Sequence, residues 1–381
     1  MTDVFILCDR LYDGISPSFL SNQTIVVRDG RIQSVTQSTD EDRSVDGAVH
    51  VAIATPGMID IQINGAADTQ FNFAPSPESL AKIAWGARQG GTAHILPTFI
   101  TAHGRAYLNA IDAVRKAITL GVPGVIGVHL EGPFLSPKRP GIHDPSAIRP
   151  LEEEDVSALE EHARDFPGII LLTLAPECQQ PRHLARLAER GIILFAGHSE
   201  AMPTDLASVR GATHLWNAMP APGSRAPGIV SEVLGGNRLF AGVIADGFHV
   251  GQHALTMSVR AAADRLCLVT DAMMTLAGTS SGFDLDGRYI SLADGRLTSE
   301  DGTLAGAHIA MDRSLQTLVG LTGIDQVTAL QMATVNPARA LGLEGELGRI
   351  EVGASASLSL FDRTLSAIGI VTDGRLHLKH P

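Results

Sequence analysis

Apolar segments alternate with amphipathic segments through most of the middle of the chain. Eight apolar segments have the character of buried strands, and they span residues 56–64, 92–100, 124–132, 168–177, 191–199, 212–219, 239–247 and 266–273. Helical periodicity lies between several of them, at residues 78–89, 107–120, 181–190 and 253–265. Strands that alternate with helices are typical of a parallel sheet, and eight such strands predict a closed (β/α)8 barrel of the TIM type.

The two ends of the chain have a different pattern, with short strands and turns. Candidate strands lie at residues 4–9, 23–30, 31–35 and 48–55, and again at 348–353, 356–362, 367–374 and 375–378. The Asp29-Gly30 step between two of them is a hairpin signal. We therefore predict a small β-sandwich domain formed by residues 1–54 and 346–381, with the barrel at residues 55–345 between its two parts.

Most of the candidate barrel strands are apolar until their C-terminal end, where they finish on residues able to do chemistry. These endings are Gln62 and Asn64, Glu131, Glu177, His198, His214 and Asn217, Asp246 and Asp271. In barrel enzymes the active site is assembled at this face from the ends of several strands. The repeated placement of carboxylates and imidazoles there therefore predicts an active site.

Glu131, His198 and His214 have the composition of a catalytic zinc site. Two imidazoles and one carboxylate leave an open coordination position for water, and zinc lowers the pKa of that water to ~7. A single histidine at a strand end is more often a hydrogen-bonded structural residue. Three such residues on separate strands of one barrel favour the metal site instead.

Asp271 follows a run that should be buried on all sides, where a carboxylate is costly unless it is paired or used. At the end of the last barrel strand it can act as a general base toward water and then as a general acid toward a departing amine. The alternative is a cap at the N-terminus of the following segment, for which aspartate is also well suited.

The composition of the chain excludes some classes of binding partner. The chain has 29 basic and 41 acidic residues and a net charge of −12, which argues against nucleic acid or an anionic membrane surface and leaves room for a local basic pocket. Its three cysteines have no metal-binding spacing, the first residues lack the basic start of a signal peptide, and no apolar run has transmembrane length. We expect a soluble cytoplasmic protein.

A series of motifs resembles the N-acetylglucosamine-6-phosphate deacetylase family of amidohydrolases. In chain order they are PGMIDIQING, HLEGPF, GIHDP, GHS, THLWNAM with a following R-x-P-G, ADGFHV, LVTDAM, GTLAGA and NPARALGL. Each match alone is weak, but the whole series is specific and spans the chain from the first barrel strand onward. The resemblance implies a metal-dependent enzyme that removes the acetyl group from a sugar phosphate.

The resemblance also implies a role for each matching residue. Glu131, His198 and His214 would bind the metal, Asp271 would be the acid–base residue, and His143 would hydrogen-bond the substrate near the scissile amide. Contacts with the sugar phosphate would come from Asn217, Ala218, Arg225 and His249. The loop at Leu304, Ala305 and Gly306 would close against the substrate. Because the family's phosphate site can lie near a dimer interface, we expect a homodimer.

The chain departs from many barrel amidohydrolases in its metal count. Where those enzymes carry His-x-His to hold a second metal, this chain has Gln62-Ile63-Asn64, and neutral amides are weak ligands compared with imidazoles. We regard Gln62 and Asn64 as remnants of a second site, and predict one divalent metal per subunit, Zn²⁺. No lysine ends the fourth strand to bridge two metals, which weakens a dihydroorotase or urease type of chemistry.

The predicted reaction converts N-acetyl-D-glucosamine 6-phosphate into D-glucosamine 6-phosphate and acetate, in amino-sugar catabolism. The nearest alternative is a related amidohydrolase, such as a deaminase or an N-acyl amino acid deacylase. An alternative of another class is a catalytically inactive sugar-phosphate sensor, against which the intact ligand set argues. A Rossmann-type oxidoreductase is disfavoured because no G-x-G-x-x-G follows the first strand.

Overall fold

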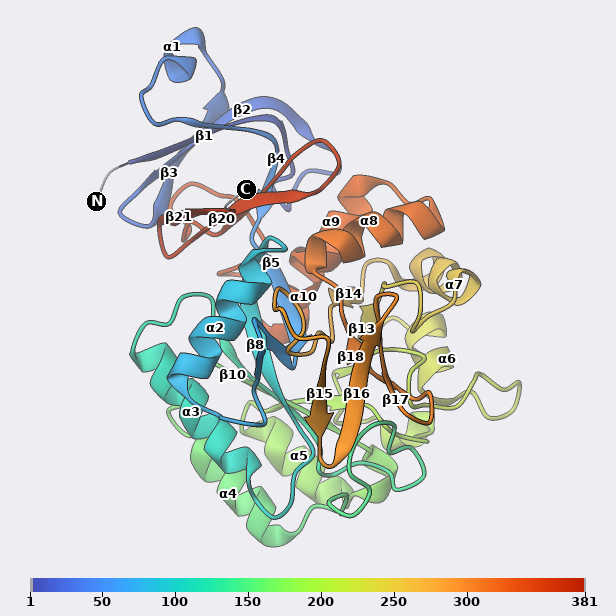
Figure 1. Cartoon of the computed structure of the whole chain (residues 1–381). Coiled ribbons are helices and arrows are strands. Elements are labelled where there is room, and N and C mark those ends of the chain that lie inside the picture. Colours follow the sequence, from blue (N-terminus) through green and yellow to red (C-terminus); the bar gives the residue numbers. More distant parts are fainter. Residues whose placement is uncertain (1–2, 380–381) are drawn as a thin grey trace.

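The computed structural model describes residues 3–379 and contains an eight-stranded parallel sheet that curls into a nearly closed barrel (Figure 1). Each strand pairs with the next one along the chain. The strands are β5 (Met58–Ile63), β8 (Thr92–Ile100), β9 (Gly127–Glu131), β10 (Ile169–Leu174), β11 (Ile193–Ala196), β12 (Gly211–Ala212), β13 (Phe240–Ile244) and β14 (Leu266–Val269). The predicted barrel is confirmed, although the sixth strand is much shorter than the predicted span 212–219.

The sixth strand ends early because its backbone turns into left-handed conformations directly after it. His214, Trp216 and Ala218 have φ angles of 29°, 82° and 50°. No strand can continue through such angles, which cost ~1–3 kcal/mol each for residues other than glycine. The result is a tight loop that presents these side chains at the barrel mouth.

Hydrogen bonds between the C-terminal ends of β5 and β14 join the first and last strands. Asp271 N–H donates to the carbonyl of Gln62 (2.9 Å), and Asn64 N–H donates to the carbonyl of Ala272 (2.8 Å). Below them, the buried carboxylate of Asp60 accepts hydrogen bonds from the backbone and hydroxyl of Thr270. This seam places the Gln62-Ile63-Asn64 segment beside Asp271.

Helices cover the outside of the barrel (Figure 1). The barrel helices are α2 (Pro77–Arg88), α3 (Tyr107–Thr119), α4 (Glu153–Ala163), α5 (Pro181–Glu189), α6 (Gly228–Gly235) and α7 (Gln252–Ala262), followed by α8 (Met311–Thr322), α9 (Gln326–Ala333) and α10 (Val335–Leu341). Helix α2 shows why they form: Ser76 caps its first turn, Pro77 starts it, and its apolar face buries Leu80 and Ile83 against the sheet. No helix among residues 3–379 is both long and apolar enough to span a bilayer.

Both ends of the chain contribute to one seven-stranded sheet at the N-terminal side of the barrel (Figure 1). Its strands are β1 (Val4–Leu11), β2 (Leu20–Arg28), β3 (Arg31–Gln37), β4 (Val49–Pro56), β19 (Leu358–Phe361), β20 (Ala367–Thr372) and β21 (Arg375–Leu378), with the four-residue helix α1 (Asp40–Arg43) beside them. Asp29 and Gly30 form the predicted hairpin turn with positive φ angles. The predicted strand at 348–353 is instead an irregular segment that ends in a turn, although Ile350 is buried in this sheet's core.

A four-stranded antiparallel sheet is inserted between β14 and α8. It consists of β15 (Gly282–Leu285), β16 (Arg288–Ala293), β17 (Arg296–Ser299) and β18 (Leu304–Ala307). Residues 304–306, predicted as a loop, therefore belong to a strand. Ala307 hydrogen-bonds with Asp271 and Met273, so this sheet is attached to the C-terminal end of the last barrel strand. A two-stranded ribbon, β6 (Gly65–Ala66) and β7 (Thr69–Gln70), lies close to the same point.

Candidate active site

A cavity of about 540 Å³ opens at the C-terminal ends of the barrel strands. Its volume is in the range typical of small-molecule sites. Most of the predicted site residues line it, namely Asn64, Glu131, His143, His198, His214, Asn217, Ala218, His249, Asp271, Leu304 and Gly306. The structure thus brings together residues from six barrel strands and the inserted sheet.

Glu131, His198 and His214 converge at the base of this cavity. The Nε2 atom of His214 lies 2.9 Å from Glu131 Oε1 and 3.1 Å from the Nε2 atom of His198. His198 Nε2 lies 3.3 Å from the same carboxylate oxygen. All three side chains are almost completely buried, so three potential ligand atoms face one point in a water-poor environment.

The donor set fits a zinc ion. Two nitrogens bound ~2.0–2.1 Å from a tetrahedral zinc lie about 3.3 Å apart, close to the separation of the two Nε2 atoms here. His198 Nδ1 lies 2.9 Å from the carbonyl oxygen of Arg139 and can donate to it, which leaves the lone pair of Nε2 free to bind a metal. Burial alone would raise the pKa of Glu131, but the imidazoles of His198 and His214 beside it hold that pKa well below its usual range.

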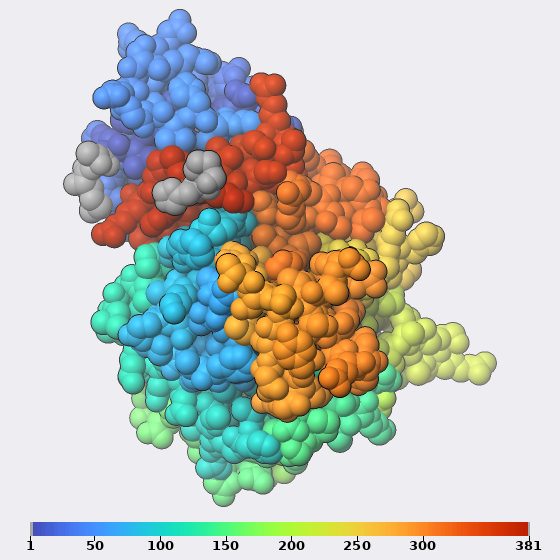
Figure 2. Space-filling model, in the orientation of Figure 1, coloured from blue at the N-terminus to red at the C-terminus, as the bar shows by residue number. Residues whose placement is uncertain are grey.

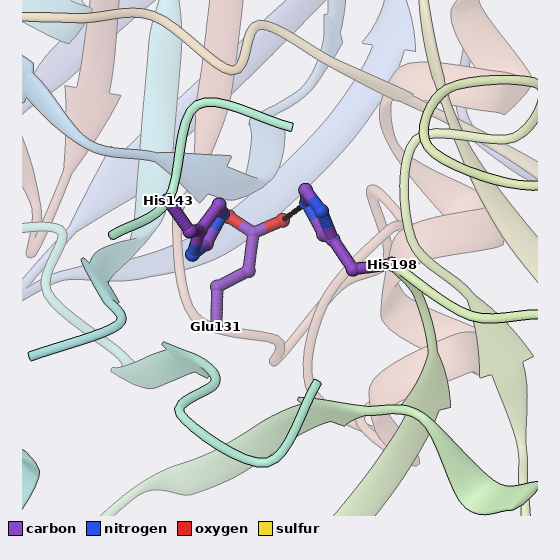
Figure 3. Close-up of side chains that lie close together, drawn as sticks. All are labelled: Glu131, His143 and His198. Carbon is purple, nitrogen blue, oxygen red and sulfur yellow. Dashed lines mark ion pairs between the residues drawn. The ribbon is translucent and has the colours of Figure 1, made fainter. Parts of the chain in front are cut away.

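His143 is a competing ligand candidate because Glu131, His143 and His198 can present ligand atoms within 4.8 Å of one another (Figure 3). The shorter contacts of His214 with both Glu131 and His198 favour His214 as the third ligand. His143 Nδ1 is instead 2.8 Å from the hydroxyl of Thr101, and its ring stands edge-on to that of His198. Burial, and then the nearby imidazole of His198, lower the pKa of His143 well below its usual value, which favours a neutral ring.

Asp271 lies next to the three ligand candidates, where two amides hold one of its oxygens. Asn64 Nδ2 donates to Asp271 Oδ1 at 2.7 Å, and Gln62 Nε2 donates to the same atom at 3.2 Å. Gln62 also donates to both carboxylate oxygens of Glu131. Gln62 thus ties the two carboxylates together, and no side chain among residues 3–379 donates a hydrogen bond to Asp271 Oδ2.

Burial, and then the charge of Glu131, raise the pKa of Asp271 to about 6. A carboxylate in that range accepts and returns a proton near neutral pH more readily than an ordinary one. Its backbone, like that of His198, is in a left-handed conformation, with φ angles of 50° and 48°. Strained backbone of this kind concentrates at functional sites.

The opposite wall of the cavity carries Asn217, Ala218 and His249. Ala218 has a φ angle of 50°, and its carbonyl accepts a hydrogen bond from Ser199 N–H. His249 Nδ1 lies 2.6 Å from Asp246 Oδ2. Burial alone would raise the pKa of Asp246, but this hydrogen bond holds it below its usual value. The imidazole is therefore fixed in place with its other nitrogen available.

Three predicted site residues do not line the cavity. Gln62 lies beneath the wall and acts through the two carboxylates it contacts. Ala305 is buried in the core of the inserted sheet, because alternate residues of a strand point to opposite faces. Arg225 belongs to the segment 221–226, in which every residue is exposed and which lies outside the cavity of its own chain.

The sequence argument missed several residues at the site. Thr101, which positions His143, directly follows the second barrel strand, so the strand-end rule applied to it as well. Lys138 and Arg139 line the cavity from the segment between Glu131 and His143, where no pattern marked them. His129 lies below Glu131 with its two ring nitrogens on the hydroxyls of Thr98 and Thr173; burial lowers its pKa to about 4.

Comparison with known proteins adds independent information. Residues 252–376 match the model of the amidohydrolase family. The chain is 32% identical to N-acetylglucosamine-6-phosphate deacetylase of Haemophilus influenzae, over 84% of this chain and 85% of that protein. It is 34% identical to N-acetylgalactosamine-6-phosphate deacetylase of a Shewanella species, over 84% and 82% of the two chains. Crystalline N-acetylglucosamine-6-phosphate deacetylase from Pasteurella multocida superposes with a TM-score of 0.92 and 30% identity, covering 99% of this chain and 100% of that one.

Proposed function

The chain belongs to the N-acetylglucosamine-6-phosphate deacetylase family of amidohydrolases, and on that premise we propose that it hydrolyses N-acetyl-D-glucosamine 6-phosphate to D-glucosamine 6-phosphate and acetate. The observation that carries the proposal is the buried cluster of Glu131, His198 and His214 with Asp271 beside it. This cluster combines a metal-ligand set with a proton-transfer group inside one cavity, which is what hydrolysis of an unreactive amide requires.

Glu131, His198 and His214 would hold one divalent metal ion, which we propose to be zinc. When bound, zinc supplies a Lewis acid for the acetyl carbonyl and a water molecule of lowered pKa. Gln62 and Asn64 donate hydrogen bonds to carboxylates through their amide nitrogens. This orientation suits them to hold Glu131 and Asp271 in place and not to bind a second cation.

Asp271 would move the proton in both halves of the reaction. Because Asn64 and Gln62 fix its Oδ1 atom, Oδ2 is the atom left to take a proton from the attacking water as the water oxygen adds to the acetyl carbon. The same oxygen then delivers the proton to the sugar nitrogen as the carbon–nitrogen bond breaks. One carboxylate held in one position can serve both steps.

His143 would stabilise the negative charge that develops on the carbonyl oxygen. In the tautomer that carries the ring's proton on Nε2, the Thr101 hydroxyl donates to His143 Nδ1 across the 2.8 Å contact between them. A neutral imidazole with its Nε2–H aimed into the cavity is a donor for the developing oxyanion. The burial that keeps the ring neutral therefore also serves the reaction.

The sugar phosphate would occupy the wall formed by Asn217, Ala218 and His249, with Leu304 and Gly306 of β18 against the sugar. We propose that Arg225 reaches the phosphate of a neighbouring subunit in a homodimer. Two observations support this: residues 221–226 are exposed, and the segment before α6 projects from the body of the molecule (Figure 2). The free cysteines favour a reducing compartment, and we place the enzyme in the cytoplasm.

N-Acetyl-D-galactosamine 6-phosphate is a second candidate substrate, because a relative named for that activity is as similar to this chain as those named for the glucosamine compound. The two sugars differ only in the orientation of one hydroxyl. An acetate-release assay with both sugar phosphates, both unphosphorylated sugars and an N-acetyl amino acid tests the proposal. We expect the highest kcat/KM with N-acetylglucosamine 6-phosphate. Acetate release from the amino acid alone would contradict the proposal.

A further inference from the structure

Lys138 and Arg139 stand out because no other lysine or arginine among residues 3–379 lines the cavity. Both side chains pair with the carboxylate of Glu200, each at 3.1 Å. Two cations thus share the single carboxylate of Glu200 at the cavity wall, while the nearby Glu177 carboxylate accepts from Glu200 N–H and the Ser199 hydroxyl. Lys138 is the more exposed of the two, with 73% of its side chain accessible, so its ammonium group is free to change partner.

The position of this pair follows from backbone contacts and not from the ion pairs alone. Glu200 comes directly after Ser199, whose N–H donates to the carbonyl of Ala218 at 3.2 Å. The N–H of Glu200 itself donates to Glu177 Oε1 at 2.6 Å. The backbone next to Glu200 thus contacts Ala218, and its two cationic partners line the same cavity as the Ala218 wall to which we assigned the phosphate.

The segment that carries the cations is also fixed relative to the metal-ligand candidates. Ser136 N–H donates to the carbonyl of His198, and the carbonyl of Arg139 accepts from His198 Nδ1 (both 2.9 Å). At its far end, the Arg288 side chain donates to the carbonyl of Ile142. The backbone is thus held on both sides, while the long stem of Lys138 leaves its ammonium group mobile.

A sugar phosphate entering this cavity has a charge problem that the pair can relieve. The whole chain carries a net charge of −12, and two of its carboxylates, Glu131 and Asp271, lie at the cavity base. His249 is engaged with Asp246, and Arg225 lies outside the cavity of its own chain. Within one subunit, Lys138 and Arg139 are the permanent cations available to a phosphate dianion.

We propose that Lys138 contacts the 6-phosphate of the substrate within its own subunit, and that Glu200 is the counter-ion which the phosphate replaces. This inference rests on the proposed function. Lys138 is then a specificity-determining residue that makes the phosphorylated sugar the better substrate. Arg139 stays paired with Glu200 and keeps the segment in position.

The test is the ratio of kcat/KM for N-acetylglucosamine 6-phosphate to kcat/KM for unphosphorylated N-acetylglucosamine, measured with zinc-loaded full-length protein. Lys138→Met keeps the side-chain length without the charge. The ratio should fall roughly 5- to 20-fold, less than for loss of a buried charge-assisted contact, because solvent screens the exposed ammonium group. Lys138→Arg should restore most of the ratio. Lys116→Met, on the exposed face of α3, is the matched control and should leave the ratio unchanged.

Glu200→Gln provides a test of opposite sign. Without its counter-ion, Lys138 should attract the phosphate more strongly, and the ratio should rise roughly 2- to 5-fold at low ionic strength. Suppose that the wild-type enzyme is active and that Lys138→Met binds the wild-type amount of metal. An unchanged ratio in Lys138→Met would then overturn the inference about Lys138 and leave the proposed function standing. Wild-type protein that releases no acetate from either sugar phosphate would overturn the proposed function, and the inference with it.

Discussion

The proton-transfer role of Asp271 is the prediction that the structure specifies most closely. In Asp271→Asn, the side-chain carbonyl oxygen can still accept the hydrogen bonds that Asn64 (2.7 Å) and Gln62 (3.2 Å) donate to Oδ1. The substituted side chain should therefore keep its position, and Glu131 should keep its hydrogen bonds from Gln62. Only the ability to take and return a proton is lost, so we expect kcat to fall roughly 10²–10⁴-fold, or about 3–5 kcal/mol.

The assay is acetate release at saturating N-acetylglucosamine 6-phosphate, with metal content measured on the same samples. Asp60→Asn is the matched control: Asp60 is another buried aspartate hydrogen-bonded at the seam between β5 and β14, but it does not line the cavity. The control should keep wild-type kcat. If Asp271→Asn binds one metal per chain and its kcat stays within about threefold of wild type, Asp271 is a structural residue and the proton-transfer argument is wrong.

Three further predictions follow from particular contacts. Arg225→Ala should lower kcat/KM for the 6-phosphate by roughly 10- to 150-fold, as expected for loss of a charge-assisted contact. If the arginine acts across a dimer, mixing Arg225→Ala subunits with Asp271→Asn subunits should restore activity. No restoration in the mixed dimers would contradict that arrangement. Thr101→Val removes the hydroxyl that contacts His143 Nδ1. It should lower kcat by roughly 5- to 30-fold and raise KM by less; an effect on KM alone would contradict the oxyanion role. Burial raises the pKa of Asp60 from 3.8 to about 7, so the folded chain retains a proton that the unfolded chain loses, and stability falls as pH rises from about 4 to 7. In urea unfolding of the metal-free proteins, the free energy of unfolding of Asp60→Asn should therefore rise relative to that of wild type across this pH window, by up to about 4 kcal/mol. A difference that stays constant with pH would contradict the buried-proton account.

The barrel was predictable because its strands are buried on both faces and appear as apolar runs with polar ends. Burial in the structure follows that pattern closely, for example through all nine residues of β8. The inserted sheet β15–β18 was not predicted, since its strands are short and only partly buried. The local signals were present in its turns, Asp286-Gly287 and Asp294-Gly295, both of which adopt positive φ angles.

The site was predictable as far as strand ends determine it. Glu131, His198, His214 and Asp271 meet because the ends of parallel strands share one face of the barrel. Sequence spacing cannot show what a loop residue reaches after a turn. The exposed position of Arg225 was therefore not predictable from the sequence.

The amide segment also needed coordinates to be understood. Gln62 and Asn64 looked like remnants of a metal site, yet both amides donate to carboxylates. Only the seam between the first and last strands, formed by long-range hydrogen bonds, brings them to Asp271. Other long-range contacts, of His129 with Thr98 and Thr173 and of Thr101 with His143, place these residues around the ligand candidates.

Zinc titration of chelator-treated protein, followed by acetate release from N-acetylglucosamine 6-phosphate, tests the central claim most directly. The structure offers one ligand cluster of Glu131, His198 and His214, with amides in place of a second set of imidazoles. We predict that the stripped protein is inactive and that activity rises linearly to a plateau at one equivalent of zinc per chain. Full activity in the stripped protein, or a plateau only at two equivalents, would contradict the account.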